Sequence, residues 1–263
     1  MSDSTIVTLV ANAGVLVTHG DTGWLVDGVH DEGGHPFSHV PEADLVRMRF
    51  GVAPFEKLDH LLFTHEHPDH FTPGLVAKLI AKRKVQSIYL PGAAHGSPAM
   101  ADLTAQAEAQ GIAIHPLSLA PGETARFDLG NGTEITAIGT RHMGPQYQAV
   151  RNDCYLLTLG GCNLLFTGDA DHVPEYFEKG LKDVDLDAAF VNPIFFHHPS
   201  GQAIIDTVFR PREVIIYHMP FAGDDTLHFT YMVGRDMTKY ARPDRRVRVL
   251  SQEGQQLRIG GEE

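Results

Sequence analysis

The sequence is short of positive charge. Lysine and arginine together number 21 against 33 aspartates and glutamates, which gives a formal charge of −12 at pH 7. A protein that binds nucleic acid needs a basic face to neutralise the phosphates. The composition therefore argues against long polyanions as partners, and we expect no nucleic-acid binding. Net charge describes only the average electrostatic field around the protein, so a small anionic molecule stays open as a ligand.

Long apolar runs and a signal sequence are also lacking. No stretch of 18 apolar residues occurs, and Met1–Thr5 has neither a basic segment nor a following apolar core. A transmembrane helix needs about 20 predominantly apolar residues, and a secretory signal needs a basic start before its apolar core. We therefore expect no membrane partner and a cytoplasmic location.

Cysteine is scarce. Cys154 and Cys162 lie in adjacent predicted strands on either side of Gly160-Gly161. In a hairpin that turns at these glycines, Cys154 would lie nearer Thr167 than Cys162. We expect both thiols to be reduced.

Two common catalytic motifs are missing too, Gly-x-Ser-x-Gly and the glycine-rich phosphate loop. The chain instead has imidazoles directly behind an apolar strand. Leu58–Phe63 reads as that strand, and His65, His67, Asp69 and His70 follow it. A strand end presents side chains from a fixed backbone, so ligands one and two residues apart can converge on one point. The pattern predicts a metal site; the alternative is a polar loop that happens to be rich in histidine.

Three more potential ligands stand at predicted strand ends or just beyond. They are His142 in Gly-Thr-Arg-His, Asp169 in Phe-Thr-Gly-Asp and His218 in Ile-Ile-Tyr-His. A donor set of imidazoles and carboxylates without a thiolate fits zinc, and it also fits manganese or iron. The residues leave the choice among these metals open.

The length, 263 residues, suits one large domain, and we expect a single domain over residues 1–263. Strands are predicted at Ile6–Val10, Val15–Thr18, Trp24–Asp27, Leu58–Phe63, Ser87–Leu90, Thr124–Asp128, Thr133–Ile138, Cys154–Leu159, Asn163–Thr167, Ala188–Asn192 and Val214–Tyr217, with a final hairpin of Arg246–Leu250 and Gln256–Ile259. Helices are predicted at Leu75–Ile80, Ser97–Gly111, Val173–Lys179, Gln202–Phe209 and Leu227–Tyr240. Two β-rich halves, each followed by helices, indicate stacked mixed sheets with helices outside.

The ordered set of potential ligands resembles a known family. His65-x-His67-x-Asp69-His70, followed by His142, Asp169 and His218, is similar to the metallo-β-lactamase-fold hydrolase superfamily from the first strands to His218. Ala11-Asn12-Ala13-Gly14 ahead of Asp27 resembles the branch that includes ascorbate-6-phosphate lactonase and related lactone or phosphodiester hydrolases. The resemblance implies an α/β (α+β) fold, a four-layer αββα sandwich of two mixed sheets flanked by helices.

The resemblance also implies how the ligands are shared between two divalent ions per chain, zinc being the first choice. One ion would be held by His65, His67 and His142, the second by Asp69, His70 and His218, with Asp169 bridging. Asp27 and Asp59 resemble superfamily positions that orient ligands. A metal-bound imidazole needs its other nitrogen hydrogen-bonded, which gives such carboxylates a physical task.

Two cations about 3.5–4 Å apart can share one water and lower its pKa to about 7, so a bridging hydroxide forms at neutral pH. The resemblance thus implies a hydrolase that attacks a small ester, lactone or phosphodiester. Asp69 is its candidate catalytic residue, because a carboxylate ligand with a second oxygen can pass the proton to the leaving group.

Residues near the ligands are candidates for substrate selection. Arg141, His197 and His198 are predicted to bind substrate, and Gln146, Tyr147 and His172 lie in neighbouring predicted loops. The long polar loop from Gly28 to about Pro41 is typical of a lid or binding loop. We expect a small-molecule substrate and leave a homo-oligomer open.

Other functions of the same fold need other features. Superfamily members that use two irons to handle oxygen or nitric oxide carry a glutamate where this sequence has His67, and they carry a fused flavin domain. They remain the main alternative. A ribonuclease would need a basic surface for RNA. A binding or scaffold protein with a decayed site would have lost ligands, and all seven are present.

Overall fold

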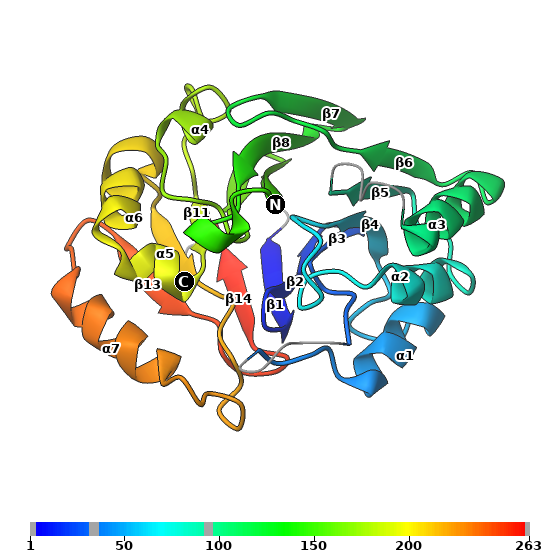
Figure 1. Cartoon of the computed structure of the whole chain (residues 1–263), viewed down its shortest axis with the longest axis horizontal. Helices are drawn as coiled ribbons and strands as arrows, with labels where there is room; N and C mark the ends of the chain where they lie inside the picture. The colour runs from blue at the N-terminus through cyan, green and yellow to red at the C-terminus, as the bar shows by residue number, and fades with distance from the viewer. Residues whose placement is uncertain (1–3, 32–36, 92–96, 261–263) are drawn as a thin grey trace.

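Two seven-stranded mixed sheets pack face to face in the computed structural model, which describes residues 4–31, 37–91 and 97–260. Helices cover the two outer faces (Figure 1). The predicted four-layer αββα arrangement and the α/β (α+β) class are therefore confirmed.

The first sheet is built mainly from the amino-terminal half. It contains β1 (Thr5–Ala11), β2 (Gly14–His19), β3 (Thr22–Val26), β4 (Leu58–Leu62), β5 (Ser87–Leu90), β6 (Ala113–Pro116) and β14 (Gln256–Ile259), in the order β14-β1-β2-β3-β4-β5-β6. The strands from β14 to β3 pair antiparallel, and those from β3 to β6 pair parallel.

The second sheet repeats this plan. It contains β7 (Thr124–Gly130), β8 (Thr133–Arg141), β9 (Arg151–Leu159), β10 (Cys162–Phe166), β11 (Ala188–Val191), β12 (Glu213–Ile216) and β13 (Arg246–Val249), in the order β13-β12-β11-β10-β9-β8-β7. An antiparallel meander from β7 to β10 is again followed by parallel strands.

The helices divide between the two outer faces. The first sheet is covered by α1 (Glu42–Phe50), α2 (Pro73–Ile80) and α3 (Pro98–Ala109). The second is covered by α4 (Glu175–Glu178), α5 (Pro193–His197), α6 (Pro199–Ile204) with its π-helical continuation η2 (Ile205–Phe209), and α7 (Phe229–Lys239). A short 3₁₀ turn, η1 (Pro145–Tyr147), follows β8.

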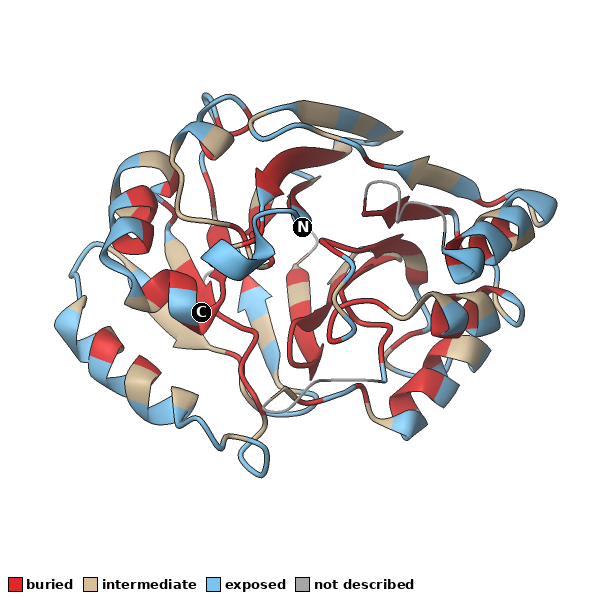
Figure 2. Cartoon of the chain, viewed as in Figure 1, coloured by how far each residue is buried: buried red, intermediate tan, exposed pale blue. Residues whose placement is uncertain are grey.

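Three apolar clusters fill the spaces between the layers. The middle one lies between the sheets and takes side chains from both, among them Trp24 and Tyr155. The other two join each sheet to its helices. Buried residues accordingly concentrate on the strands and on the inner faces of the helices (Figure 2). Strands with apolar layers on both faces appear in a sequence as nearly continuous apolar runs, which is why they could be predicted.

The predicted final hairpin is wrong. β13 pairs parallel with β12 in the second sheet, and β14 pairs antiparallel with β1 in the first. The connection crosses between the sheets: the amide of Leu250 donates to Ile216 of the second sheet, and the carbonyl of Gln255 accepts from Leu9 of the first. An apolar pattern identifies a strand but not its partner, and the connection here is long enough to change sheets.

Smaller differences have local causes. Helix α1 was not predicted, because only Asp44, Leu45 and Met48 of its residues are buried and its apolar face is therefore narrow. Strand β6 was missed, because it lies at a sheet edge and none of its residues is buried. The helix expected at Val173–Lys179 is a single turn that begins after Pro174.

The prediction for the cysteines is confirmed. Both are free, and the Sγ of Cys154 lies 3.2 Å from the carbonyl oxygen of Thr167.

Among the described residues, no helix has both the length and the apolar character that crossing a bilayer requires.

The packing between the sheets predicts a clear stability difference between two leucines. Leu157 of β9 is fully buried in the middle cluster, whereas Leu227 is 60% exposed. Leu157→Ala should lower the free energy of unfolding by about 2–5 kcal/mol, because it removes buried methyl groups and leaves a cavity. Leu227→Ala should change it by less than about 0.5 kcal/mol. Urea denaturation followed by circular dichroism measures both; equal effects would contradict this account of the core.

Candidate metal centre

The seven candidate ligands lie at one edge of the sandwich, where strands of both sheets end. His65 and its neighbours follow β4, His142 follows β8, Asp169 follows β10, and His218 follows β12. The carboxyl ends of parallel strands meet at the same edge of a sheet, which is where ligands bind in open α/β sheets. The fold therefore brings together residues that are far apart in the sequence.

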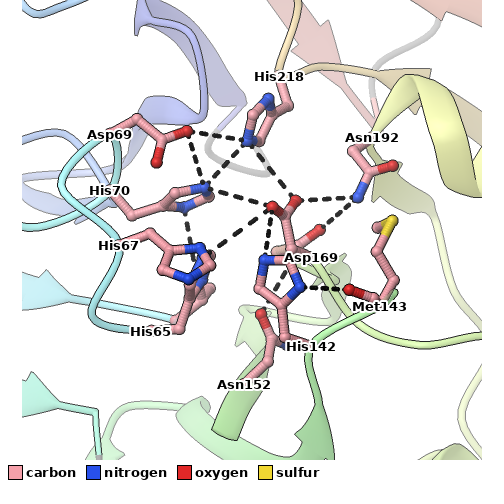
Figure 3. Close-up of polar contacts among 12 residues, drawn as sticks. His65, His67, Asp69, His70, His142, Met143, Asn152, Asp169, Asn192 and His218 are labelled. Atoms are coloured by element: carbon pink, nitrogen blue, oxygen red, sulfur yellow. Dashed lines mark hydrogen bonds and ion pairs between the residues drawn. The ribbon is translucent and has the colours of Figure 1, made fainter. Parts of the chain in front are cut away.

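The ligand atoms fall into two groups (Figure 3). The first group is His65, His67, His142 and Asp169, and the second is Asp69, His70 and His218, with the atoms of each group within 4.8 Å of one another. In the first, Nε2 of His65 lies 3.1 Å from Nδ1 of His67. In the second, the Nε2 atoms of His70 and His218 are 2.9 Å apart. Six of the seven residues fall into the groups that the sequence resemblance implied, and Asp169, which it implied to bridge the ions, falls in the first group.

Asp169 lies between the two groups. Its Oδ2 is 3.2 Å from Nε2 of His142 and 4.0 Å from Nε2 of His65 in the first group. The same oxygen is 3.8 Å from Nε2 of His70, and Oδ1 is 3.6 Å from Nε2 of His218, in the second group. One carboxylate thus faces imidazoles on both sides, as a bridging ligand must.

The imidazoles are oriented through their outer nitrogens, which fits metal binding. Nδ1 of His70 lies 3.0 Å from Oδ2 of Asp27, and Nδ1 of His142 lies 2.6 Å from the carbonyl oxygen of Met143. Nδ1 of His65 lies 3.0 Å from the hydroxyl of Thr64. When Nδ1 carries the proton, Nε2 turns its lone pair toward the centre. Hydrogen bonds of this kind fix the tautomer of metal-ligating histidines. The donor set therefore fits a metal.

Asp27 is the main support of this arrangement. Besides facing His70, its carboxylate accepts hydrogen bonds from the amide of Thr64 (2.8 Å) and from its hydroxyl (2.7 Å). Asp27 is fully buried. The prediction that Asp59 also orients ligands is wrong. Asp59 lies at the start of β4, at the end opposite the ligands, and its side chain accepts a hydrogen bond from Gln86.

The backbone at the site adopts uncommon conformations. Asp27 and His218 have positive φ angles of 48° and 58°. At Gly168, with φ of 54°, a Cβ would lie 2.6 Å from Oδ1 of Asn152 and 2.8 Å from Thr64. Glycine at position 168 therefore allows the chain to turn tightly before Asp169. Left-handed backbone of this kind is concentrated at functional sites.

Three asparagines that the sequence did not identify as site residues hold the ligands. Asn12 donates to Oδ2 of Asp69 (3.2 Å), and Asn192 donates to Oδ1 of Asp169 (3.0 Å). The side-chain oxygen of Asn152 accepts from the amide of Asp169. Asn192 is the last residue of the strand predicted at Ala188–Asn192, and this position was a usable signal, because the ligands themselves stand at strand ends or just beyond.

Burial and neighbouring charges shift the pKa values of the candidate ligands. Burial lowers the pKa of His65 well below its usual value, and it also lowers that of His67. Burial acts the same way on His70, but the carboxylates of Asp69 and Asp27 outweigh it and raise its pKa to about 9. Burial opposes the charge on Asp169, yet the imidazoles of His218 and His142 hold its pKa well below the usual range. The carboxylates are thus ionised and require positive charge beside them.

A cavity of about 480 Å³ opens beside the ligands. Its lining includes five candidate ligands, His67, Asp69, His142, Asp169 and His218. It also includes four residues that the sequence placed near the substrate, Gln146, Tyr147, His172 and His198. The aromatic ring of Tyr147 lies 5.0 Å from that of His67 and 4.7 Å from that of His142. These are the distances of direct ring contacts.

Two residues predicted to bind substrate lie outside this cavity. Arg141 is exposed, and its guanidinium donates to the carbonyl oxygen of Gln148. Nδ1 of His197 lies 2.5 Å from the buried carboxylate of Asp236, so this histidine connects α5 to α7. Neither partner could be predicted from the sequence, because both contacts depend on how loops and helices pack.

The loop from Gly28 to Pro41 contributes to the cavity through Phe37, whose ring centre lies 4.9 Å from that of His218. At the start of the loop, Val29 bridges to Phe71 beside the candidate ligands. Residues 32–36, and with them His35, lie outside the described residues.

The contacts of Asp27 and Asp59 give a test with a matched control. Asp27→Ala should lower zinc affinity about 10-fold to 100-fold, because His70 and Thr64 lose the carboxylate that orients them. Asp59→Ala, on the same strand pair but at the opposite end, should leave the affinity unchanged. Titration against a chromophoric chelator measures both. Equal affinities in the two variants would show that Asp27 does not orient the ligands.

The chain is similar to one protein-family profile and to several solved structures. The profile described as the beta-lactamase superfamily domain matches residues 25–223, whereas comparison with curated proteins found no match. CmlA, a diiron β-hydroxylase from Streptomyces venezuelae, has a similar structure, with a TM-score of 0.61 and 19% identity over 98% of this chain and 55% of CmlA. This chain thus spans about half the length of that protein.

Two hydrolase structures match over nearly the full length of both chains. Igni18, a metallo hydrolase from the archaeon Ignicoccus hospitalis, has a TM-score of 0.59 and 14% identity over 98% of this chain and 100% of its own. An isothiocyanate hydrolase from Delia radicum gut bacteria has a TM-score of 0.60 and 14% identity over 96% and 98%. These likenesses concern the fold. Together with the profile match from β3 to beyond His218, they show that the chain belongs to the beta-lactamase superfamily and has the metallo-β-lactamase fold.

Proposed function

We propose that this protein is a dinuclear metal-dependent hydrolase that cleaves a small ester, lactone or phosphodiester. The observation that carries the proposal is the position of Asp169 between two groups of imidazoles. The first ion would be held by His65, His67 and His142, the second by Asp69, His70 and His218, and Asp169 would contact both. Nitrogen and oxygen donors without a thiolate suit zinc first, with manganese or iron as alternatives.

When bound, two divalent ions would polarise the oxygen of the substrate and make a water acidic enough to attack it near neutral pH. The chain itself supplies the movement of the proton. Asp69 lines the cavity, and Asn12 holds one of its carboxylate oxygens. In hydrolysis the oxygen of water bonds to the acyl carbon or phosphorus, and the bond to the leaving oxygen breaks. Asp69 would carry a proton from the water to that leaving oxygen.

The surroundings of the site support a small-molecule substrate in the cytoplasm. A cavity of about 480 Å³ is in the size range of small-ligand sites. The free Cys154 and Cys162 suit a reducing compartment.

A second candidate is diiron oxygen chemistry, which the structural likeness to the diiron β-hydroxylase CmlA favours. The donor set accepts iron as well as zinc. His67, in place of the glutamate expected of oxygen- or nitric-oxide-handling members, favours the hydrolase. Iron in the purified protein together with oxygen consumption, and no hydrolysis, would establish the alternative.

The proposed function is tested by changing one ligand of each kind. Protein purified without added metal should contain about two divalent ions per chain by elemental analysis and should hydrolyse one class among lactones, phosphodiesters and esters. Asp169→Ala and His67→Ala should abolish turnover and lower the metal content, while circular dichroism shows the fold largely retained. His19→Ala, at the far end of β2, is the matched control. An Asp169→Ala protein that kept most of its activity would rule out a bridging role.

A further inference from the structure

The cavity beside the candidate ligands has one polar and one apolar wall. The polar part of the lining comprises five candidate ligands together with Gln146, Tyr147, His172, Asn192 and His198. The apolar wall is formed by Phe37, Met143, Pro193, Ile194 and Phe229. These side chains come from the loop before α1, the segment after β8, the start of α5 and the start of α7. A substrate placed with its reacting bond at the ligands would therefore lay its remaining part on apolar surface.

No lysine or arginine lines the cavity among the described residues. The undescribed segments, residues 1–3, 32–36, 92–96 and 261–263, contain neither residue type. Arg141 is exposed and engaged with the carbonyl oxygen of Gln148. Arg141, which was predicted from the sequence to bind substrate, is thus absent from the lining.

Two of the remaining polar side chains of the lining, His172 and Asn192, offer no positive charge. Burial, and then His198, lower the pKa of His172 to about 4, so its imidazole is uncharged at neutral pH. Asn192 already uses its side-chain amide on Asp169 and its oxygen on the amide of Phe195. An anionic group that entered the apolar part of the cavity would lose its water and meet no lysine or arginine there, which is costly.

The apolar wall is held in place by the same residues that hold the ligands. Asn192 both donates to Asp169 and caps α5, which carries Ile194. The pair of His197 and Asp236 ties α5 to α7, at whose first residue Phe229 stands. The position of the wall relative to the candidate ligands is therefore fixed by direct hydrogen bonds and not by loops alone.

We propose that the substrate of this site is an uncharged carboxylic ester or lactone whose apolar group packs on Ile194 and Phe229, and that esters with an anionic tail are selected against. This inference rests on the proposed hydrolase function and narrows it. The oxygen of water bonds to the acyl carbon, the acyl carbon–oxygen ester bond breaks, and the leaving oxygen takes a proton. The products are a carboxylic acid and an alcohol, or one hydroxy acid from a lactone.

The first test compares two esters that differ in one group. 4-Nitrophenyl butyrate ends in a methyl group, and 4-nitrophenyl hydrogen succinate ends in a carboxylate in the same place. With zinc-loaded protein, kcat/KM for the butyrate should exceed that for the succinate by roughly 10-fold to 200-fold, the range a pocket achieves through apolar contacts. A preference for the succinate would overturn the inference while leaving a hydrolase in place.

A charge placed on the apolar wall should change this preference. Ile194 is 39% exposed and lines the cavity, whereas Val46 on α1 is 41% exposed and lies outside it. Ile194→Lys should lower the butyrate-to-succinate ratio about 10-fold or more, because the new ammonium can pair with the carboxylate. Val46→Lys should leave the ratio unchanged. An unchanged ratio in both variants would show that the substrate does not lie against Ile194.

Binding without turnover separates this inference from the proposed function. N-Phenyl-1-naphthylamine is uncharged, and 1-anilinonaphthalene-8-sulfonate is the same aromatic skeleton with a sulfonate. Fluorescence titration should show tighter binding of the uncharged probe, weakened by Phe229→Ala and by Ile194→Lys but not by Val46→Lys. If the uncharged probe binds more tightly in this way but no ester is hydrolysed, the proposed hydrolase function is wrong, and the inference that the cavity binds uncharged apolar ligands is retained. If the sulfonate binds more tightly, or neither lining variant weakens the uncharged probe, the inference fails.

Discussion

Two carboxylates surrounded by imidazoles at the meeting edge of the two sheets impose the main constraint on this structure. Asp69 and Asp169 are ionised there, and such charges need positive partners. The layer behind them satisfies the outer nitrogens of His65, His70 and His142, so that the inner nitrogens stay available. These donors are held in position by the strand ends, by the residues with positive φ and by the supporting asparagines.

Each sheet contributes part of this arrangement. The first supplies Asp27 and the run from His65 to His70, and the second supplies His142, Asp169 and His218. Neither sheet alone contains a full donor set for two ions. The apolar cluster between the sheets therefore does more than stabilise the fold, because the relative position of the sheets sets the distances between donors from different sheets. The position of Ile194 in the apolar wall depends on the same packing through Asn192.

Much of this could be predicted from the sequence, because strands with both faces covered are apolar throughout and ligands follow them directly. The apolar strand pattern alone was enough to predict that His65, Asp169 and His218 stand just beyond strand ends. The partner of a strand could not be predicted: β14 joins β1 from the other end of the chain. Side-chain partners were also beyond reach. Asn152 on Asp169, and His197 on Asp236, result from how loops and helices pack in three dimensions.

The central claim is that seven side chains of this chain hold two metal ions with Asp169 between them. Anomalous diffraction at the zinc edge, from crystals grown with zinc, tests it most directly. Two peaks per chain are expected, one among His65, His67 and His142 and one among Asp69, His70 and His218, with an oxygen of Asp169 next to each. A single peak, or peaks away from these residues, would contradict it.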